Sequence, residues 1–427
     1  MPLPAQAILP SLSALRALKA PVLPLPSLVL EHEEITLPNT QKRLAGRIAL
    51  KPNIDLNDWS FCAVIDWIEF SVYLGRGTQI QHLQKILRKT VGRNCHIVPH
   101  ELAAGNVFTS CTIKVQEPET FARVAAVDHH LRQTYGLLNA TEIVGLEVSI
   151  DAYPVKAGYE ARARLLGVLQ RTISTSRDIW SQNNSRPRMN YGPPSTAPRG
   201  QKGPTERLSP GPDLDHRNGS RSDPHSHKVP FIDSTMYLGA KGADVMIGIM
   251  DKVKDRQHPN GSYMALPDAE KRSRIEVTIR GAELGRLGVS DIKSLRTLKL
   301  SAFQRRYFQF QLPTFPAKAT GAGAVGGGAA MAKAVMHNTQ QSWRAQTYLK
   351  SGITGLMTKD AATMLTRKRA LKALTTHLMD HGMKLPDNRQ VGTPPAFVAY
   401  TEFCKKVSSA LVNLERRQAT AWKGSGI

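Results

Sequence analysis

Two carboxylates stand four residues apart in the segment GLEVSIDAY, at Glu147 and Asp151. Residues 141–153 are rich in β-branched side chains and predict a strand, on which alternate residues project from the same face. Glu147 and Asp151 therefore share one face, while Val148 and Ile150 point into the predicted core. Carboxylate oxygens suit Mg²⁺ and Mn²⁺, and an ion held there would stabilise negative charge on a phosphate. The pattern fits either such a metal site or ordinary acidic side chains on an exposed sheet face.

Four basic residues cluster in the C-terminal region, at Arg367, Lys368, Arg369 and Lys372. The surrounding segment AATMLTRKRALKALTTHLMDHGM has apolar residues at helical spacing and predicts an amphipathic helix. Basic side chains on such a helix contact the phosphates of DNA or simply form a solvated face. The sequence leaves both interpretations open.

Other patterns that commonly carry chemistry are missing from the sequence. The four cysteines include no CxxC pair, so the sequence indicates neither a zinc site nor a disulfide framework. HEXXH and GxSxG words do not occur, and no GK[ST] follows the Gly/Ala-rich segment that begins at residue 317. The cysteine usage fits a reducing, intracellular setting.

The first regular part of the chain shows strand and helix patterns in the order strand, helix, strand, strand, helix, strand. Apolar runs rich in β-branched and aromatic residues mark the strands, and apolar residues at helical spacing mark the helices. The expected elements are a strand over 61–74, a helix over 78–91, strands over 95–99 and 106–115, a helix after Pro118 and a strand over 141–153. This order is typical of a ferredoxin-like βαββαβ domain, an antiparallel sheet with two helices on one face.

A second patterned half follows a long polar insertion. Residues 183–228 contain eight prolines and no Val, Ile, Phe or Trp, so we expect them to form a disordered, basic insertion. Strand patterns then recur at 234–240, 244–253 and 272–281, followed by a helix pattern over 290–310. These elements predict a second sheet-bearing half.

The expected organisation is an α+β fold with a ferredoxin-like half, a second sheet-bearing half and a helical C-terminal region. The C-terminal region is basic, with 13 Lys and Arg against 5 Asp and Glu over residues 346–427. The parts are a flexible proline-rich lead-in (1–56), the first α+β half (57–182), the insertion (183–228), the second α+β half (229–316), a Gly/Ala linker (317–345) and the basic helical region (346–427).

The 427-residue chain is strongly basic, with 57 Lys and Arg against 34 Asp and Glu and a formal net charge of +23. This excess favours a polyanionic partner, first nucleic acid and second an anionic membrane surface, although a merely basic protein would show it too. Hydrophobic residues make up 41%, which excludes general disorder. The sequence has no run of roughly 18 apolar residues that could span a membrane, and its proline-studded N-terminus is unlike a signal peptide. We therefore expect a soluble, cytoplasmic protein without a membrane partner.

Four sequence words in a fixed order carry a family resemblance. They are VIDWIEFS (64–71), GLEVSIDAY (145–153), YLGAKGADVMIGIMDK (237–252) and RIEVTIRGAEL (274–284). Together they resemble the replication-initiator family of rolling-circle plasmids and filamentous phages. The likeness spans about residues 62–300 and is interrupted by the insertion at 183–228.

The resemblance implies a specific chemistry on DNA. Members of this family bind an origin, nick one strand through a tyrosine that becomes linked to the 5′ phosphate, and later rejoin the strand. A divalent metal held by carboxylates assists the transfer, so the resemblance implies Mg²⁺ or Mn²⁺ as cofactor and DNA as partner. Residues that match the family words are Glu147, Asp151 and Glu276 as metal ligands, and Lys252 and Arg274 as catalytic cations.

The sequence departs from the family at the nucleophile, because Met250 occupies the position of the family tyrosine. A thioether cannot attack a phosphodiester, so Tyr237 on the neighbouring predicted strand becomes the nearest candidate nucleophile, with Tyr263 as another. Tyr237 could equally be a half-buried aromatic residue of the sheet. The alternative function is therefore a non-catalytic DNA-binding relative, a regulator or accessory factor, that lost the nucleophile. A third hypothesis is an RNA-binding module that presents its sheet to single strands.

Overall fold

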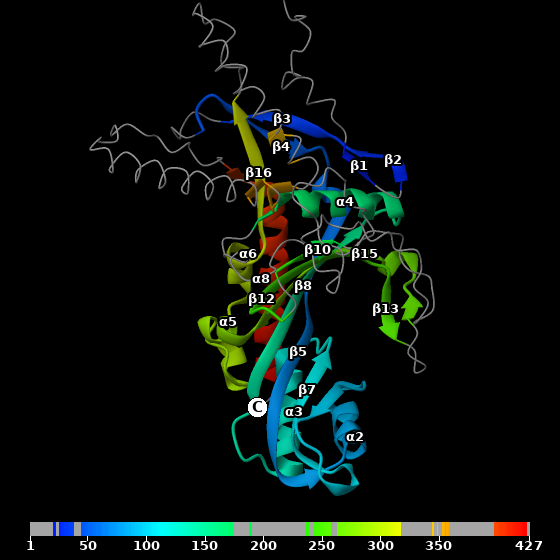
Figure 1. Ribbon diagram of the computed structural model, residues 1–427, viewed down its shortest axis with the longest axis vertical. Coiled ribbons are helices and arrows are strands. Elements are labelled where there is room, and N and C mark those ends of the chain that lie inside the picture. The colour runs from blue at the N-terminus through cyan, green and yellow to red at the C-terminus, as the bar shows by residue number, and fades with distance from the viewer. Residues whose placement is uncertain are drawn as a thin grey trace, which may run out of the picture.

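The computed structural model describes residues 20–22, 25–37, 44–174, 188–189, 236–239, 242–257, 263–316 and 397–424, with a few positions between 344 and 357. Within these ranges the chain forms an α+β fold of two main antiparallel sheets covered by helices (Figure 1). The sequence predicted this class of fold, and the structure confirms it.

The first half has the predicted order of elements. It consists of β5 (Trp59–Thr78), α2 (Ile80–Val91), β6 (His96–Pro99), β7 (Phe108–Gln116), α3 (Phe121–Tyr135) and β8 (Glu142–Pro154). These strands lie side by side in the order β8-β5-β7-β6, and all neighbours are antiparallel. This is the strand order of a ferredoxin-like domain. Helix α3 begins after Thr120, whose side chain accepts a hydrogen bond from Arg123 N at 3.3 Å.

The second half extends the same sheet instead of forming a separate one. Strand β15 (Arg272–Arg280) pairs with β8, and β12 (Val245–Lys252), β11 (Met236–Leu238) and β10 (Arg188–Met189) follow. The result is one eight-stranded sheet in the order β10-β11-β12-β15-β8-β5-β7-β6. Between β12 and β15 the chain forms the hairpin of β13 (Lys254–Gln257) and β14 (Tyr263–Ala265), and α5 (Gly281–Arg286) follows β15.

One face of the large sheet is covered by helices. Val148, Ile150 and Ile275 are fully buried on this face, where α4 (Tyr159–Thr172) and α8 (Thr401–Gly424) pack. Arg417 on α8 donates to the carbonyl of Ala63 on β5 at 2.5 Å. The predicted helical C-terminal region is thus confirmed for residues 401–424, whereas the predicted basic helix around Arg367, Lys368, Arg369 and Lys372 lies outside the described residues.

Two predictions about secondary structure were wrong within the described residues. Strands in the predicted flexible lead-in are β1 (Ala20–Val22), β2 (Leu25–Leu30), β3 (His32–Thr36) and β4 (Arg47–Pro52). Strands β3 and β4 form a second sheet, in the order β17-β16-β4-β3, with β16 (Gln309–Pro316) and β17 (Phe397–Ala399), and β9 (Ile173–Ser174) also pairs with β16. Strand β1 pairs with β2 and β3 with β4, and only β4 among them also pairs with β16, a distant part of the chain that local patterning does not indicate.

The helix predicted over 290–310 is replaced by short turns. These are the 3₁₀ helices η5 (Lys293–Thr297) and η6 (Leu300–Ala302) and one turn of α-helix, α6 (Phe303–Arg306). Ser294 N donates to Asp291 Oδ1 at 2.8 Å, which closes a local turn that competes with a regular helix. The remaining 3₁₀ helices are η1 (Leu56–Asp58), η2 (Ala104–Asn106) and η4 (Asp268–Glu270).

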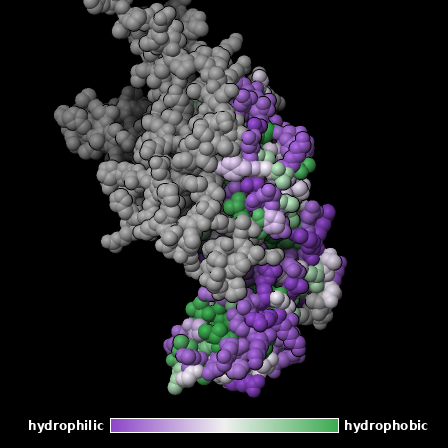
Figure 2. Space-filling model, turned by 90° about the vertical axis from the view of Figure 1, so that its right-hand side faces the viewer, coloured by the Kyte–Doolittle hydropathy of each residue, from purple (hydrophilic) through white to green (hydrophobic). Residues whose placement is uncertain are grey.

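One side of the described part is mainly polar. Figure 2 shows mostly hydrophilic residues on the side of the molecule at the right of Figure 1, with smaller hydrophobic areas toward its lower end. Among the helices that the structure describes, none has the length and apolar character needed to cross a membrane.

Helix α8 should contribute strongly to stability through Phe403, whose side chain is fully buried and contacts the rings of Phe61 and Phe310. We expect Phe403→Ala to lower the free energy of unfolding by about 3–5 kcal/mol, because it leaves a large cavity between α8 and both sheets. Urea denaturation measures the change. A loss below about 1 kcal/mol would contradict this packing.

Candidate metal centre

The face of the large sheet opposite the helices carries a row of polar side chains. In the pairing of β8 with β15, Glu147 lies opposite Thr278, Ser149 opposite Glu276, and Asp151 opposite Arg274. Directly opposed residues of antiparallel strands project from the same face, so all six side chains belong to it. We call this surface the polar face.

A β-bulge in β5 adds a third acidic residue to the polar face. Ile65 pairs with Val148 and Trp67 pairs with Glu147, so Asp66 is an extra residue between two consecutive pairs. A bulge turns a side chain away from strict alternation. The Asp66 carbonyl accepts a hydrogen bond from Glu117 N at 2.6 Å, which fixes the bulge against the segment that follows β7.

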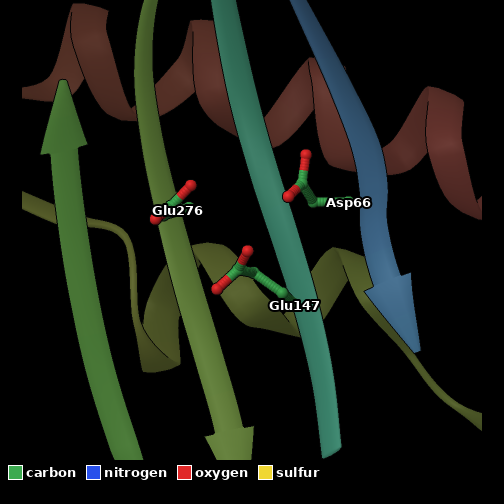
Figure 3. Close-up of side chains that lie close together, drawn as sticks. All are labelled: Asp66, Glu147 and Glu276. Atoms are coloured by element: carbon green, nitrogen blue, oxygen red, sulfur yellow. The ribbon is translucent and has the colours of Figure 1, made fainter. Parts of the chain in front are cut away.

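Three carboxylates meet on the polar face. Asp66, Glu147 and Glu276 each offer an oxygen, and these oxygens lie within 4.8 Å of one another. Figure 3 shows the three side chains on three neighbouring strands, β5, β8 and β15, with α8 crossing behind the sheet. Glu147 and Glu276 are only 6% and 7% exposed. This triad could hold a metal ion, because oxygen ligands at such spacing suit a hard divalent cation.

Gly248 on β12 makes room for the triad. It pairs with Glu276, and a Cβ at Gly248 would lie 2.7 Å from Glu276 Oε1. The Glu276 carboxylate therefore extends over the backbone of the neighbouring strand. Ser149 Oγ, on the strand at the other side of Glu276, is buried and has no hydrogen-bond partner among the described residues. It adds a polar atom beside the carboxylates.

Burial and mutual repulsion keep the triad partly protonated. Burial raises the pKa of Glu147 to about 7, although a hydrogen bond from Thr278 opposes this shift. Burial, together with the charges of Glu147 and Asp66, raises the pKa of Glu276 to about 8. For Asp66, burial raises the pKa, but the charges of Arg274 and Lys252 and the hydrogen bonds with Glu147 and Arg274 together outweigh burial and lower the pKa overall. Near pH 7 the triad therefore lacks a full counter-charge, which a divalent cation would supply.

Asp151 is placed differently from the sequence prediction. It is 1% exposed, so the predicted exposed sheet face is in fact buried. Arg274 Nε donates to Asp151 Oδ1 at 2.6 Å, and Arg274 Nη2 and Arg272 Nε donate to Oδ2 at 2.8 and 3.0 Å. Asp151 is the centre of an ion-pair network and lies outside the triad, whereas Glu147 and Glu276 are in it.

The two predicted catalytic cations lie beside the triad. Arg274 is 1% exposed and bridges Asp151 and Asp66, since its Nη1 also donates to Asp66 Oδ1. Burial lowers the pKa of Arg274, but its hydrogen bonds to Asp151 together with the charges of Asp151, Asp66 and Glu276 outweigh burial and hold the pKa well above its usual value. Lys252 is half-buried at the end of β12, and its charge acts on both Asp66 and Glu276.

The candidate nucleophile is on the same face. Tyr237 on β11 pairs with Gly248, which in turn pairs with Glu276, so these three residues form one row across three strands. Because Gly248 has no side chain, only backbone separates Tyr237 from Glu276 along this row. Met250 pairs with Arg274 one row away. The side chain of Tyr263 lies outside the described residues.

Sequence reasoning missed three residues, one of the triad and two that border it. Asp66 is the first, and the other two are Trp67 and Lys114, whose Nζ lies 3.7 Å from the centre of the Trp67 ring. Arg280 Cζ lies 4.8 Å from the same ring and its Nη1 is 2.5 Å from Glu69 Oε2. The word VIDWIEFS contains Asp66 and Trp67. The acidic residues of this word are three positions apart, so strand alternation does not predict that Asp66 faces the triad, and the bulge explains it.

Comparisons with known proteins do not extend this description. The chain matches no protein-family model, and a search of the curated proteins finds no significant relative.

Protonation of the triad predicts how stability depends on pH. In the unfolded chain Glu147 and Glu276 ionise near pH 4.5, but in the folded chain they ionise at about 7 and 8. Between the unfolded-state and folded-state pKa values the folded state binds more protons than the unfolded state, so the free energy of unfolding falls as the pH rises through this range. For chelator-treated protein we expect the free energy of unfolding to fall from pH 6.5 to 8.5, and to fall less in Glu276→Gln. A flat profile, or the same profile for both proteins, would contradict the raised pKa values.

The contrasting environments of Asp151 and Glu147 can be separated by mutation. Asp151→Asn should lower the free energy of unfolding by about 3–5 kcal/mol, because it removes the carboxylate that pairs with two buried guanidinium groups. Glu147→Gln should cost at most about 1 kcal/mol at pH 8, because it removes a carboxyl group from a repulsive cluster. Urea denaturation of both variants tests this. Equal losses would mean that the two acids have the same role.

Proposed function

We propose that the chain is a DNA-binding replication initiation protein of plasmid or phage type, which acts in the cytoplasm. It would nick origin DNA by metal-assisted transfer of a phosphodiester to a tyrosine. The observation that carries this proposal is the meeting of Asp66, Glu147 and Glu276 on the polar face, where the resemblance implied Glu147 and Glu276 as metal ligands. The net charge of +23 supports a nucleic-acid partner.

The residues of the polar face suit phosphodiester transfer. Tyr237 would attack the phosphorus, so that a Tyr237 Oη–P bond forms and the P–O3′ bond breaks. The phenol proton leaves to solvent, and the departing O3′ takes up a proton. Mg²⁺ or Mn²⁺ bound by the triad would supply positive charge to the phosphate oxygens. The energy of the broken bond is kept in the phosphotyrosine, which allows the strand to be rejoined.

The cations around the triad have separate roles in this proposal. Arg274 is held by Asp151 and Asp66, so it acts as a positioning residue that keeps Asp66 ionised and aimed at the metal. Lys252 and Lys114 are half-buried on either side of the triad and are suited to contact the phosphates that flank the scissile bond.

A second candidate function has one observation in its favour. Met250 stands on the polar face at the family's nucleophile position, one row from Glu276. A relative that lost its nucleophile there would bind origin DNA as a regulator or accessory factor without cutting it. The two proposals differ only in whether Tyr237 forms a covalent bond with DNA.

Covalent capture distinguishes the two functions. The wild-type chain with Mn²⁺ and a random pool of single-stranded oligonucleotides should yield a protein–DNA adduct on a denaturing gel. We expect Tyr237→Phe and Glu147→Gln to reduce the adduct by about 100-fold or more, because they remove the nucleophile and a metal ligand. Tyr153→Phe is the matched control, since Tyr153 lies on β8 and contacts Arg272 away from the triad. An adduct that survives in Tyr237→Phe would assign the chemistry to another residue, and DNA binding without any adduct would favour the non-catalytic function.

A further inference from the structure

A pocket of about 720 Å³ opens on the helix-covered side of the sheet, opposite the triad. It lies between α3, the loop before β8, the η5 turn and the end of α8. We call it the Trp422 pocket, after the residue near the end of α8 that lines it. Its volume lies within the range of pockets that bind small ligands such as a nucleotide.

One wall of the pocket is an aromatic–cation pair. Arg296 Cζ lies 5.0 Å from the centre of the Trp422 ring. Indole and guanidinium planes are the groups on which nucleobases stack in single-strand-binding proteins. Ala125 and Ile292 are buried and give the pocket an apolar floor. A flat, partly apolar ligand fits such a wall and floor.

The charges of the pocket favour an anion. Its two acidic residues are engaged within the protein, since Asp128 accepts from Arg132 Nε at 2.8 Å and Asp291 Oδ1 accepts from Ser294 N at 2.8 Å. Lys293 and Arg296 are both exposed at the rim, where they can reach a ligand. The pocket thus offers a stacking surface next to cations, a combination that matches the base and phosphate of a nucleotide.

We infer that the Trp422 pocket binds one nucleotide of a DNA strand, with the base against Trp422 and Arg296 and a phosphate beside Lys293. The inference rests on the proposed function in taking DNA as the partner. It adds a second contact on the side of the sheet away from the triad, so the chain would hold DNA on two faces.

Fluorescence anisotropy tests the inference by measuring the Kd of the full chain for a labelled oligothymidylate of about 12 nucleotides. We expect Trp422→Leu to raise the Kd about tenfold and Lys293→Gln several-fold, whereas Trp422→Phe, which keeps a ring, changes it less than about twofold. Lys89→Gln is the matched control, because it removes the same charge from an exposed position on α2. If Trp422→Leu does not fold, the Kd values of Lys293→Gln and Arg296→Gln test the inference instead, because both side chains are exposed and their replacement should not disturb folding.

Three results would overturn the inference. The first is that the pocket variants bind oligothymidylate as tightly as the wild-type chain does, or lose no more affinity than Lys89→Gln loses. The second is pocket-dependent binding of dAMP with unchanged oligonucleotide affinity, which would make the ligand a free nucleotide. The third is competition by polyglutamate as strong as by unlabelled oligothymidylate, which would make the site a binder of acidic peptides. The adduct assay is independent of all three, so adduct formation with an unaffected Kd would reject this inference and keep the proposed function.

Discussion

Three carboxylates that lie within 4.8 Å of one another, two of them buried, cannot all carry their charge unless positive charge is brought to them. The protein supplies part of that charge through Arg274, whose guanidinium reaches Asp66 from one side and Asp151 from the other. Asp151 in turn holds Arg272, so the ion-pair network along β8 and β15 fixes the cation that keeps Asp66 ionised. The raised pKa values of Glu147 and Glu276 show that this charge is incomplete, and a divalent cation would complete it.

The sheet brings these groups together by joining its two halves. Pairing of β15 with β8 places Glu276 beside a strand more than a hundred residues earlier in the chain. The bulge in β5 then turns Asp66 toward the same point, and Gly248 leaves the space that the Glu276 carboxylate occupies. The helices pack on the opposite face, where α8 contributes the buried Phe403 and leaves the polar face uncovered by the helices that the structure describes.

Alternation and helical spacing were sufficient to predict the βαββαβ order and the shared face of Glu147 and Asp151, because both are local properties of the chain. The role of Asp151 was not predictable in this way, since its partners Arg272 and Arg274 are 121 and 123 residues away. Asp66 was missed because a bulge breaks the alternation on which the reasoning relied. The second sheet was missed because β16, which joins it by pairing with β4, comes from a distant part of the sequence, while β3 pairs only with the nearby β4.

Isothermal titration calorimetry of Mn²⁺ binding at pH 7 tests the central claim that the triad is a metal site. The account predicts one Mn²⁺ per wild-type chain, with proton release that appears as a dependence of the heat on the buffer, because Glu147 and Glu276 lose protons on binding. Asp66→Asn should abolish this binding, and Asp268→Asn, which removes an exposed carboxylate that is not part of the triad, should leave it unchanged. No binding at millimolar Mn²⁺, or equal binding by the two variants, would contradict the account.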